Sequence, residues 1–328
     1  AGVWERSPSF LSLMKTDTAI KSTDDLWGYY YNRVNNILQK HNLYLTGWEE
    51  VGFKKVLENG KKVNVINQDL ATKNIHLEVW NNVLGWGAED LAYKLANRGY
   101  PVILSCVTNL YFDMAYNKAF NEPGYYWGGY ADVDRSFSFI PYDYFKNTDK
   151  DRMGETLKPA AFLNKEKLTP NGKANIIGLQ GALWGETLIS TDRMEYMLLP
   201  KLLGLAERAW AKDPEWATEK DTVKSKTLYT EAWCQFVNVL GKTELPRLDY
   251  YANGFKYRIP DAGAVSINGQ VFANVQMPGF IIHYTTNNQT PSLNSPVYQS
   301  PINTKGLIKL AVFNSSGRAG KTVSIQNN

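Results

Sequence analysis

Apolar and polar positions follow two different patterns along this chain, and the pattern changes near residue 241. Before that point, short apolar segments alternate with stretches in which apolar residues recur every three or four positions. The apolar segments predict strands over 43–48, 74–80, 100–107 and 175–186, and the periodic stretches predict helices over 22–41, 88–99, 195–211 and near 226–240. Strands that alternate with helices favour parallel pairing, with the helices packed outside the sheet.

After Gly241 the chain consists of short alternating segments broken by turn-forming pairs such as Asn-Gly and Pro-Gly. This pattern predicts a small antiparallel β-sandwich of about 75 residues. We therefore expect a larger α/β part over residues 1–240, a linker over 241–255 and a β-sandwich domain over 256–328. The tryptophans support this division, because all 10 of them lie at or before position 233.

Length and charge exclude several classes of protein. A chain of 328 residues is long enough for two hydrophobic cores. Its net charge of +4 is mild and contains no block of Lys or Arg, so we expect no nucleic-acid partner. No run of 18 apolar residues predicts a membrane-spanning segment. The opening residues AGVWERSP lack the pattern of a signal peptide, so the chain is either cytoplasmic or follows a segment that was removed.

Cysteine and histidine give no sign of redox or metal chemistry. Cys106 and Cys234 are far apart in apolar stretches, which predicts two buried free thiols. The three histidines, His41, His76 and His283, are scattered and form no metal-binding spacing. We therefore expect neither a metal site nor a cofactor.

Aromatic and acidic residues gather where the predicted parallel strands end. They are Trp48, Trp80, Asp113, Trp184 and Glu186. Ligands of (β/α) folds bind at the C-terminal ends of the strands. Trp127 belongs to a loop of about 60 residues between the third and fourth strands, and loops of that length inside a compact domain are usually functional.

Flat aromatic faces pack against the C–H faces of sugar rings, and carboxylates accept hydrogen bonds from neighbouring hydroxyls. The strand-end residues and Trp127 therefore predict a shared carbohydrate pocket. A single tryptophan on a strand is more often part of a core, and Trp210 and Trp233, which lie in helical patterns, are predicted to be core residues.

A set of motifs gives the chain a family resemblance. The motifs are GWEE (47–50), NIHLEVWNNVLGWG (74–87), YFDMAYN (111–117), GYYWGGY (124–130), GLQGALWGET (178–187) and EYMLLPKLLGLAERAW (195–210). Together they resemble the family 20 glycoside hydrolases, the β-N-acetylhexosaminidases, and most closely the bacterial chitobiase type. The resemblance covers most of residues 1–240, and the C-terminal segment resembles the small immunoglobulin-like domain that ends the chitobiases.

The resemblance implies a (β/α)8 barrel, of which the four predicted strands correspond to the second half. It implies release of terminal N-acetylhexosamine from an oligosaccharide or glycan by substrate-assisted retention. The implied roles are walls of the terminal-sugar pocket for Trp48, Trp80 and Trp184, a hydrogen bond to the acetamido oxygen for Tyr111, sugar-hydroxyl acceptors for Asp113 and Glu186, and stacking on the next sugar for Trp127.

One departure from the family is large. The catalytic Glu and the Asp before it belong to a Gly-Gly-Asp-Glu strand end, which this sequence does not contain, and the arginine expected from the first strand is also absent. Glu49 and Glu50 have no matching role. We therefore expect the C-terminal part of a longer enzyme, inactive without its N-terminal half, or else a sugar-binding or structural fragment that never catalyses. The family suggests a periplasmic, outer-membrane-associated or secreted bacterial protein.

Overall fold

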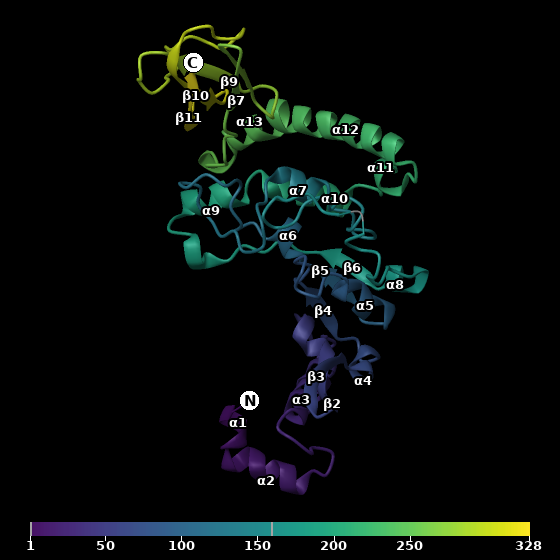
Figure 1. Ribbon diagram of the computed structural model, residues 1–328. Coiled ribbons are helices and arrows are strands. Elements are labelled where there is room, and N and C mark those ends of the chain that lie inside the picture. The colour runs from purple at the N-terminus through teal and green to yellow at the C-terminus, as the bar shows by residue number, and fades with distance from the viewer. Residues whose placement is uncertain (1, 159) are drawn as a thin grey trace. The chain divides into compact units, whose positions relative to one another are not determined.

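The computed structural model describes residues 2–158 and 160–328 (Figure 1). The chain divides into two compact units. The first runs to Leu183 and includes Glu207–Ala209, and the second comprises Trp184–Ala206 and Trp210–Asn328.

A four-stranded parallel sheet forms the centre of the first unit. Its strands are β1 (Thr46–Trp48), β4 (His76–Val79), β5 (Val102–Leu104) and β6 (Ile176–Leu179), hydrogen-bonded in the order β1-β4-β5-β6. The apolar residues of β4 and β5 explain this position, since Leu77, Val79, Val102 and Leu104 are all at most 1% exposed. The four predicted strands and their parallel pairing are confirmed, although each strand is shorter than its apolar segment.

Short helices and one hairpin complete the first unit. Its remaining elements are α1 (Gly2–Glu5), α2 (Pro8–Thr16), α3 (Asp25–Gln39), η1 (Glu49–Gly52), β2 (Phe53–Glu58), β3 (Lys61–Ile66), α4 (Gln68–Ala71), α5 (Leu91–Asn97), α6 (Val107–Leu110), α7 (Val133–Phe137) and α8 (Pro170–Ala174). The predicted helices over 22–41 and 88–99 are confirmed as α3 and α5. The antiparallel pair β2 and β3 was not predicted.

The second unit begins with helices. They are η2 (Gly185–Thr187), α9 (Thr191–Leu198), most of α10 (Lys201–Trp210), α11 (Glu215–Thr218), α12 (Thr222–Val239), η3 (Leu240–Glu244), α13 (Leu245–Leu248) and η4 (Tyr251–Asn253). The single helix predicted over 195–211 is wrong, because α9 and α10 are separated at Pro200. Proline has no backbone N–H and clashes with the preceding turn, so a helix does not continue through it. The helix predicted near 226–240 is confirmed as α12.

An antiparallel β domain ends the second unit. Its strands are β7 (Gly263–Ile267), β8 (Gln270–Asn274), β9 (Ile281–Thr285), β10 (Gly306–Phe313) and β11 (Ala319–Asn327). They form a three-stranded sheet in the order β11-β10-β9 and a two-stranded sheet of β7 and β8. Ile308, Leu310 and Val312 of β10 are fully buried, so the central strand supplies the core. The predicted C-terminal antiparallel β structure is confirmed.

Two predictions of burial are wrong. Cys106 is buried as expected, but Cys234 is exposed. Along α12 only Ser225 and Val237 are buried, so the apolar neighbours of Cys234 did not indicate a covered helix face. Trp210 is 90% exposed as the last residue of α10, whereas Trp233 is half-buried.

Among the helices of residues 2–158 and 160–328, none is both long and apolar enough to cross a membrane.

Candidate functional site

A buried carboxylate joins the ends of β1 and β4. Glu49 follows the last residue of β1, Trp48, and is 4% exposed. Its Oε2 accepts hydrogen bonds from the backbone N–H groups of Trp80 (2.8 Å) and Asn81 (3.1 Å). Burial raises the pKa of Glu49 to about 7, although these two N–H groups act in the opposite direction. Two predicted pocket walls, Trp48 and Trp80, therefore flank one buried acceptor.

Three predicted site residues come together around one apolar cluster. Trp80 and Trp127 pack against a buried group formed by Val83, Val107, Tyr111, Met114, Ala131 and Ala182. The Trp127 ring centroid lies 5.9 Å from that of Trp80 and 6.1 Å from that of Tyr111, with interplanar angles of 79° and 89°. Edge-to-face contacts of this kind are favoured by the aromatic quadrupole. The contacts hold the Trp127 indole in one orientation.

Backbone pairing explains how a residue from the long loop reaches this cluster. Tyr125 N–H donates to the Asp113 carbonyl (2.9 Å), and Ala115 N–H donates to the Tyr125 carbonyl (2.6 Å). The Asp113 side chain at this turn is only 1% exposed. A Cβ on Gly128 would lie 2.6 Å from Val107 Cγ2, so a glycine after Trp127 lets the loop approach α6 closely. The tyrosine-rich loop is thus fixed beside Asp113 and Tyr111.

The motif that contains Trp184 crosses from one compact unit to the other. Ala182 forms a parallel bridge with Tyr111, donates to Leu110 O (2.9 Å) and accepts from Phe112 N–H (2.7 Å). Trp184 and Glu186 belong to the second unit, where Trp184 is 39% exposed and Glu186 is also exposed. Their place in a shared pocket stays a prediction, as do the roles of the other site residues.

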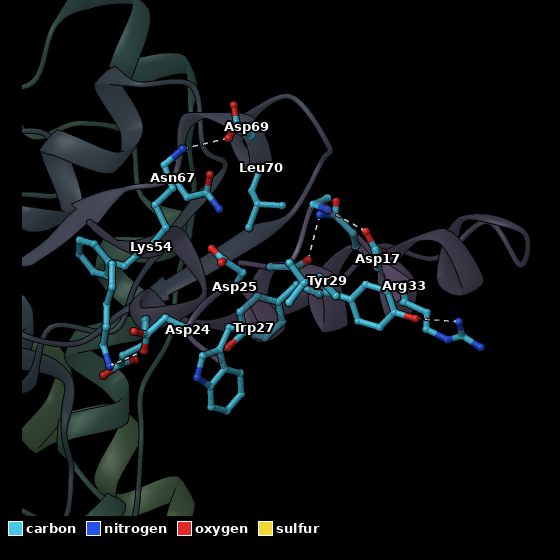
Figure 2. A pocket seen from close by; sticks show the side chains of 18 of the residues that line it. Asp17, Asp24, Asp25, Trp27, Tyr29, Arg33, Lys54, Asn67, Asp69 and Leu70 are labelled. Carbon is cyan, nitrogen blue, oxygen red and sulfur yellow. Dashed lines mark hydrogen bonds and ion pairs between the residues drawn. The ribbon is translucent and has the colours of Figure 1, made fainter. Parts of the chain in front are cut away.

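A large cavity of about 940 Å³ lies elsewhere in the first unit, along α3 and the hairpin of β2 and β3 (Figure 2). Its charged lining is partly paired, with Lys54 Nζ 3.0 Å from Asp69 Oδ2 and Asp24 bound by Lys55 and Lys62. The hydrogen bond from Lys62 lowers the pKa of Asp24. None of the predicted site residues lines this cavity, so we do not assign the sugar site to it.

Two features of the first unit were not predicted from the sequence. Glu49 was given no role, although its position directly after Trp48 was a signal that it lies at a strand end. Trp86 was not predicted as a site residue, but its ring lies nearly parallel to that of Trp127, with centroids 6.0 Å apart and an interplanar angle of 15°. A tryptophan between two glycines, a few residues after Trp80, was the available signal.

Residues 1–213 match the family model for glycosyl hydrolase family 20, catalytic domain. The chain belongs to glycosyl hydrolase family 20. Residues 244–322 match the chitobiase/β-hexosaminidase C-terminal domain, which corresponds to the antiparallel β domain. The family resemblance seen in the motifs is therefore confirmed.

Relatives with names consistent with this family cover most of the chain. A β-hexosaminidase of Vibrio vulnificus is 29% identical over 99% of this chain and 38% of its own length, and an N,N'-diacetylchitobiase of Vibrio harveyi is 29% identical over 85% of this chain and 31% of its own. The crystal structure of a GH20 exo-β-N-acetylglucosaminidase from Vibrio harveyi, in complex with N-acetylglucosamine, gives a TM-score of 0.49 at 24% identity, covering 79% of this chain and 31% of that one. The chain thus spans well under half the length of these relatives.

Proposed function

We propose that this chain is the C-terminal part of a β-N-acetylhexosaminidase, which releases N-acetylhexosamine from the non-reducing end of an oligosaccharide or glycan. The observation that carries the proposal is the contact of Trp80, Tyr111 and Trp127 around one cluster, beside the ends of parallel strands. Family membership supports the reaction class. Aromatic faces and a buried carboxylate are the groups that a sugar site needs.

In the proposed mechanism the substrate supplies its own nucleophile. The acetamido oxygen attacks the anomeric carbon as the glycosidic C–O bond breaks, and a general acid protonates the leaving oxygen. Water then opens the resulting oxazolinium ion, so the configuration is retained. We assign to Tyr111 a hydrogen bond to the acetamido oxygen, and to Asp113 and Glu186 the binding of sugar hydroxyls. Trp48, Trp80 and Trp184 would enclose the terminal sugar, and Trp127 would stack on the next.

The proposal also includes a second polypeptide region that completes the barrel. Within the described residues, β1 pairs with β4 alone and β6 with β5 alone, so the four-stranded sheet has two open edges. A closed (β/α)8 barrel has none. The 328 residues also contain no Gly-Gly-Asp-Glu segment to supply the general acid. We propose that an N-terminal half provides both, and we refer to the two halves together as the assembled protein.

The test is hydrolysis of a nitrophenyl N-acetylglucosaminide by this chain alone and by the assembled protein, with the N-terminal half supplied in trans or fused. General acid catalysis typically contributes about 10²–10⁴-fold, so we expect the assembled protein to exceed the chain alone by at least that factor. Hydrolysis by the chain alone at the rate of an active assembled protein would show that the acid lies within this chain and would refute the assignment.

A sugar-binding or structural protein without activity is the alternative. It predicts that the assembled protein binds N-acetylglucosamine, or nothing, without releasing nitrophenol. Calorimetry with the Trp80→Ala variant separates these two cases. If the assembled protein binds the sugar in this pocket without hydrolysing it, removal of the half-buried Trp80 wall should abolish the binding.

A further inference from the structure

Trp86 lies at the tip of a loop whose backbone is tightly held. Gly85 and Gly87 on either side of it have φ values of +87° and +85°, a conformation that favours glycine. Both of their N–H groups donate to Glu89 Oε1, at 2.5 Å from Gly85 and 3.3 Å from Gly87. The Glu89 side chain is 4% exposed, and its Oε2 forms an ion pair with Lys165. The backbone of the loop is therefore held by a buried carboxylate that is paired with a lysine.

The same loop presents a large apolar ring to solvent. Trp86 is 48% exposed, although the carboxylate that holds its neighbours is almost fully buried. Exposing an indole forgoes the free energy that burial of its apolar surface would contribute. A rigid loop that carries an exposed aromatic ring is typical of a binding surface, because little conformational entropy is lost when a ligand covers it.

The position of Trp86 relative to Trp127 identifies the kind of ligand. Their rings are within 15° of parallel, but the centroids are 6.0 Å apart. Rings in direct face-to-face contact would be separated by about 3.5 Å, so neither ring directly covers the face of the other. Trp127 in turn contacts Trp80 edge to face. Trp80, Trp127 and Trp86 thus form a continuous aromatic series that starts at the proposed terminal-sugar pocket and ends at the most exposed ring.

We propose that Trp86 binds a third sugar ring, the one beyond the sugar that stacks on Trp127. The ligand is a linear oligomer of at least three N-acetylhexosamine units, whose C–H faces would cover the Trp127 and Trp86 rings in turn. This inference rests on the proposed function, because it takes the Trp80 pocket as the site of the terminal sugar.

The experiment compares the assembled protein with its Trp86→Ala variant on the N-acetylglucosamine disaccharide and trisaccharide. An aromatic contact of this kind corresponds to roughly three- to tenfold in affinity, so we expect KM for the trisaccharide to rise by that factor with kcat unchanged. The disaccharide does not reach Trp86, and its KM and kcat should stay the same. Trp86→Tyr keeps a flat ring and should retain most of the trisaccharide affinity, which also covers the case in which the alanine variant fails to fold.

Trp27→Ala is the matched control, since Trp27 of α3 is similarly exposed at 44% but lies in the separate cavity of Figure 2. This variant should change neither KM nor kcat for either oligomer. An equal loss on both oligomers would mean that Trp86 only supports Trp127, and no loss on either would mean that it binds no sugar, so both results overturn the inference. If the unmodified assembled protein acts on neither oligomer, the proposed function itself fails and this inference fails with it.

Discussion

The parallel-sheet region and the C-terminal β domain both bury polar side chains, but they use them differently. In the sheet region, Glu49 and Glu89 accept N–H groups from segments that carry Trp80 and Trp86, and the rings themselves stay partly exposed. In the β domain, Asn314 Nδ2 donates to the Asp249 carboxylate (2.9 and 3.0 Å) and to the Tyr257 hydroxyl (2.8 Å).

The aromatic partner in the β domain is closed off from solvent. Tyr257 is fully buried, and burial raises its pKa to about 12. Buried hydrogen bonds therefore position partly exposed aromatic rings in the sheet region, whereas in the β domain they hold a tyrosine that is fully buried. If the proposed function is correct, we expect a buried polar anchor to mark a binding site only where the aromatic ring that it positions remains accessible.

The largest expected effect concerns the buried hydrogen bonds of Asn314 with Asp249 and Tyr257. Asn314→Ala removes three hydrogen bonds to Asp249 and Tyr257 and leaves a buried carboxylate short of donors. The free energy of unfolding of the second unit should fall by about 3 kcal/mol. Hydrogen exchange should accelerate in β10 and β11 but not in β4 and β5.

The matched control is Asn303→Ala, an exposed asparagine of the same domain that accepts one hydrogen bond from Gln270. It should change exchange in neither region. Equal acceleration of β4 and β10 in the Asn314 variant would contradict the idea that this network stabilises its own unit.

The next effect concerns the pH dependence of the sheet region. The pKa of Glu49 is raised from its usual 4.5 to about 7, so the folded state binds a proton that the unfolded chain releases between these values. The contribution of Glu49 to the free energy of unfolding should rise as the pH falls from about 7 to about 4.5, by up to about 3 kcal/mol in total. It should be constant above about pH 7. Glu49→Gln, which cannot titrate, should remove this slope from denaturant unfolding curves measured across that range.

Glu50→Gln serves as the control, because Glu50 adjoins Glu49 but is exposed. This variant should keep most of the slope. If the two variants depend on pH in the same way, Glu49 is not the titrating group.

Apolar patterning predicts the sheet region better than it predicts the contacts of the site. Leu77 and Val79 of β4 and Val102 and Leu104 of β5 are apolar because they lie on the buried face of the sheet, so the strands and their pairing were predictable. The hairpin of β2 and β3 was missed although Asn59-Gly60 between alternating segments is a strong hairpin signal. The motifs named Trp80 and Trp127 as site residues, but the contacts of Glu49 and Glu89 depend on strand register and loop geometry. A single carboxylate in a sequence usually indicates only a solvated charge.

The smallest expected effect asks whether exposure also marks a ligand wall in the second unit. Trp184 is 39% exposed, so Trp184→Ala should change thermal unfolding little, whereas a stacking wall contributes about 1 kcal/mol to sugar binding. The affinity of the assembled protein for N-acetylglucosamine, measured by calorimetry, should therefore fall roughly fivefold.

Trp210→Ala is the control, because Trp210 is 90% exposed and has no proposed contact with sugar, so its loss should leave the affinity unchanged. Unchanged affinity in the Trp184 variant would remove Trp184 from the pocket, and a large fall in its melting temperature would instead make Trp184 a core residue. A selective loss of affinity would extend the contrast to the ALWGE motif, where an accessible tryptophan lies two residues after Ala182, itself hydrogen-bonded beside Tyr111.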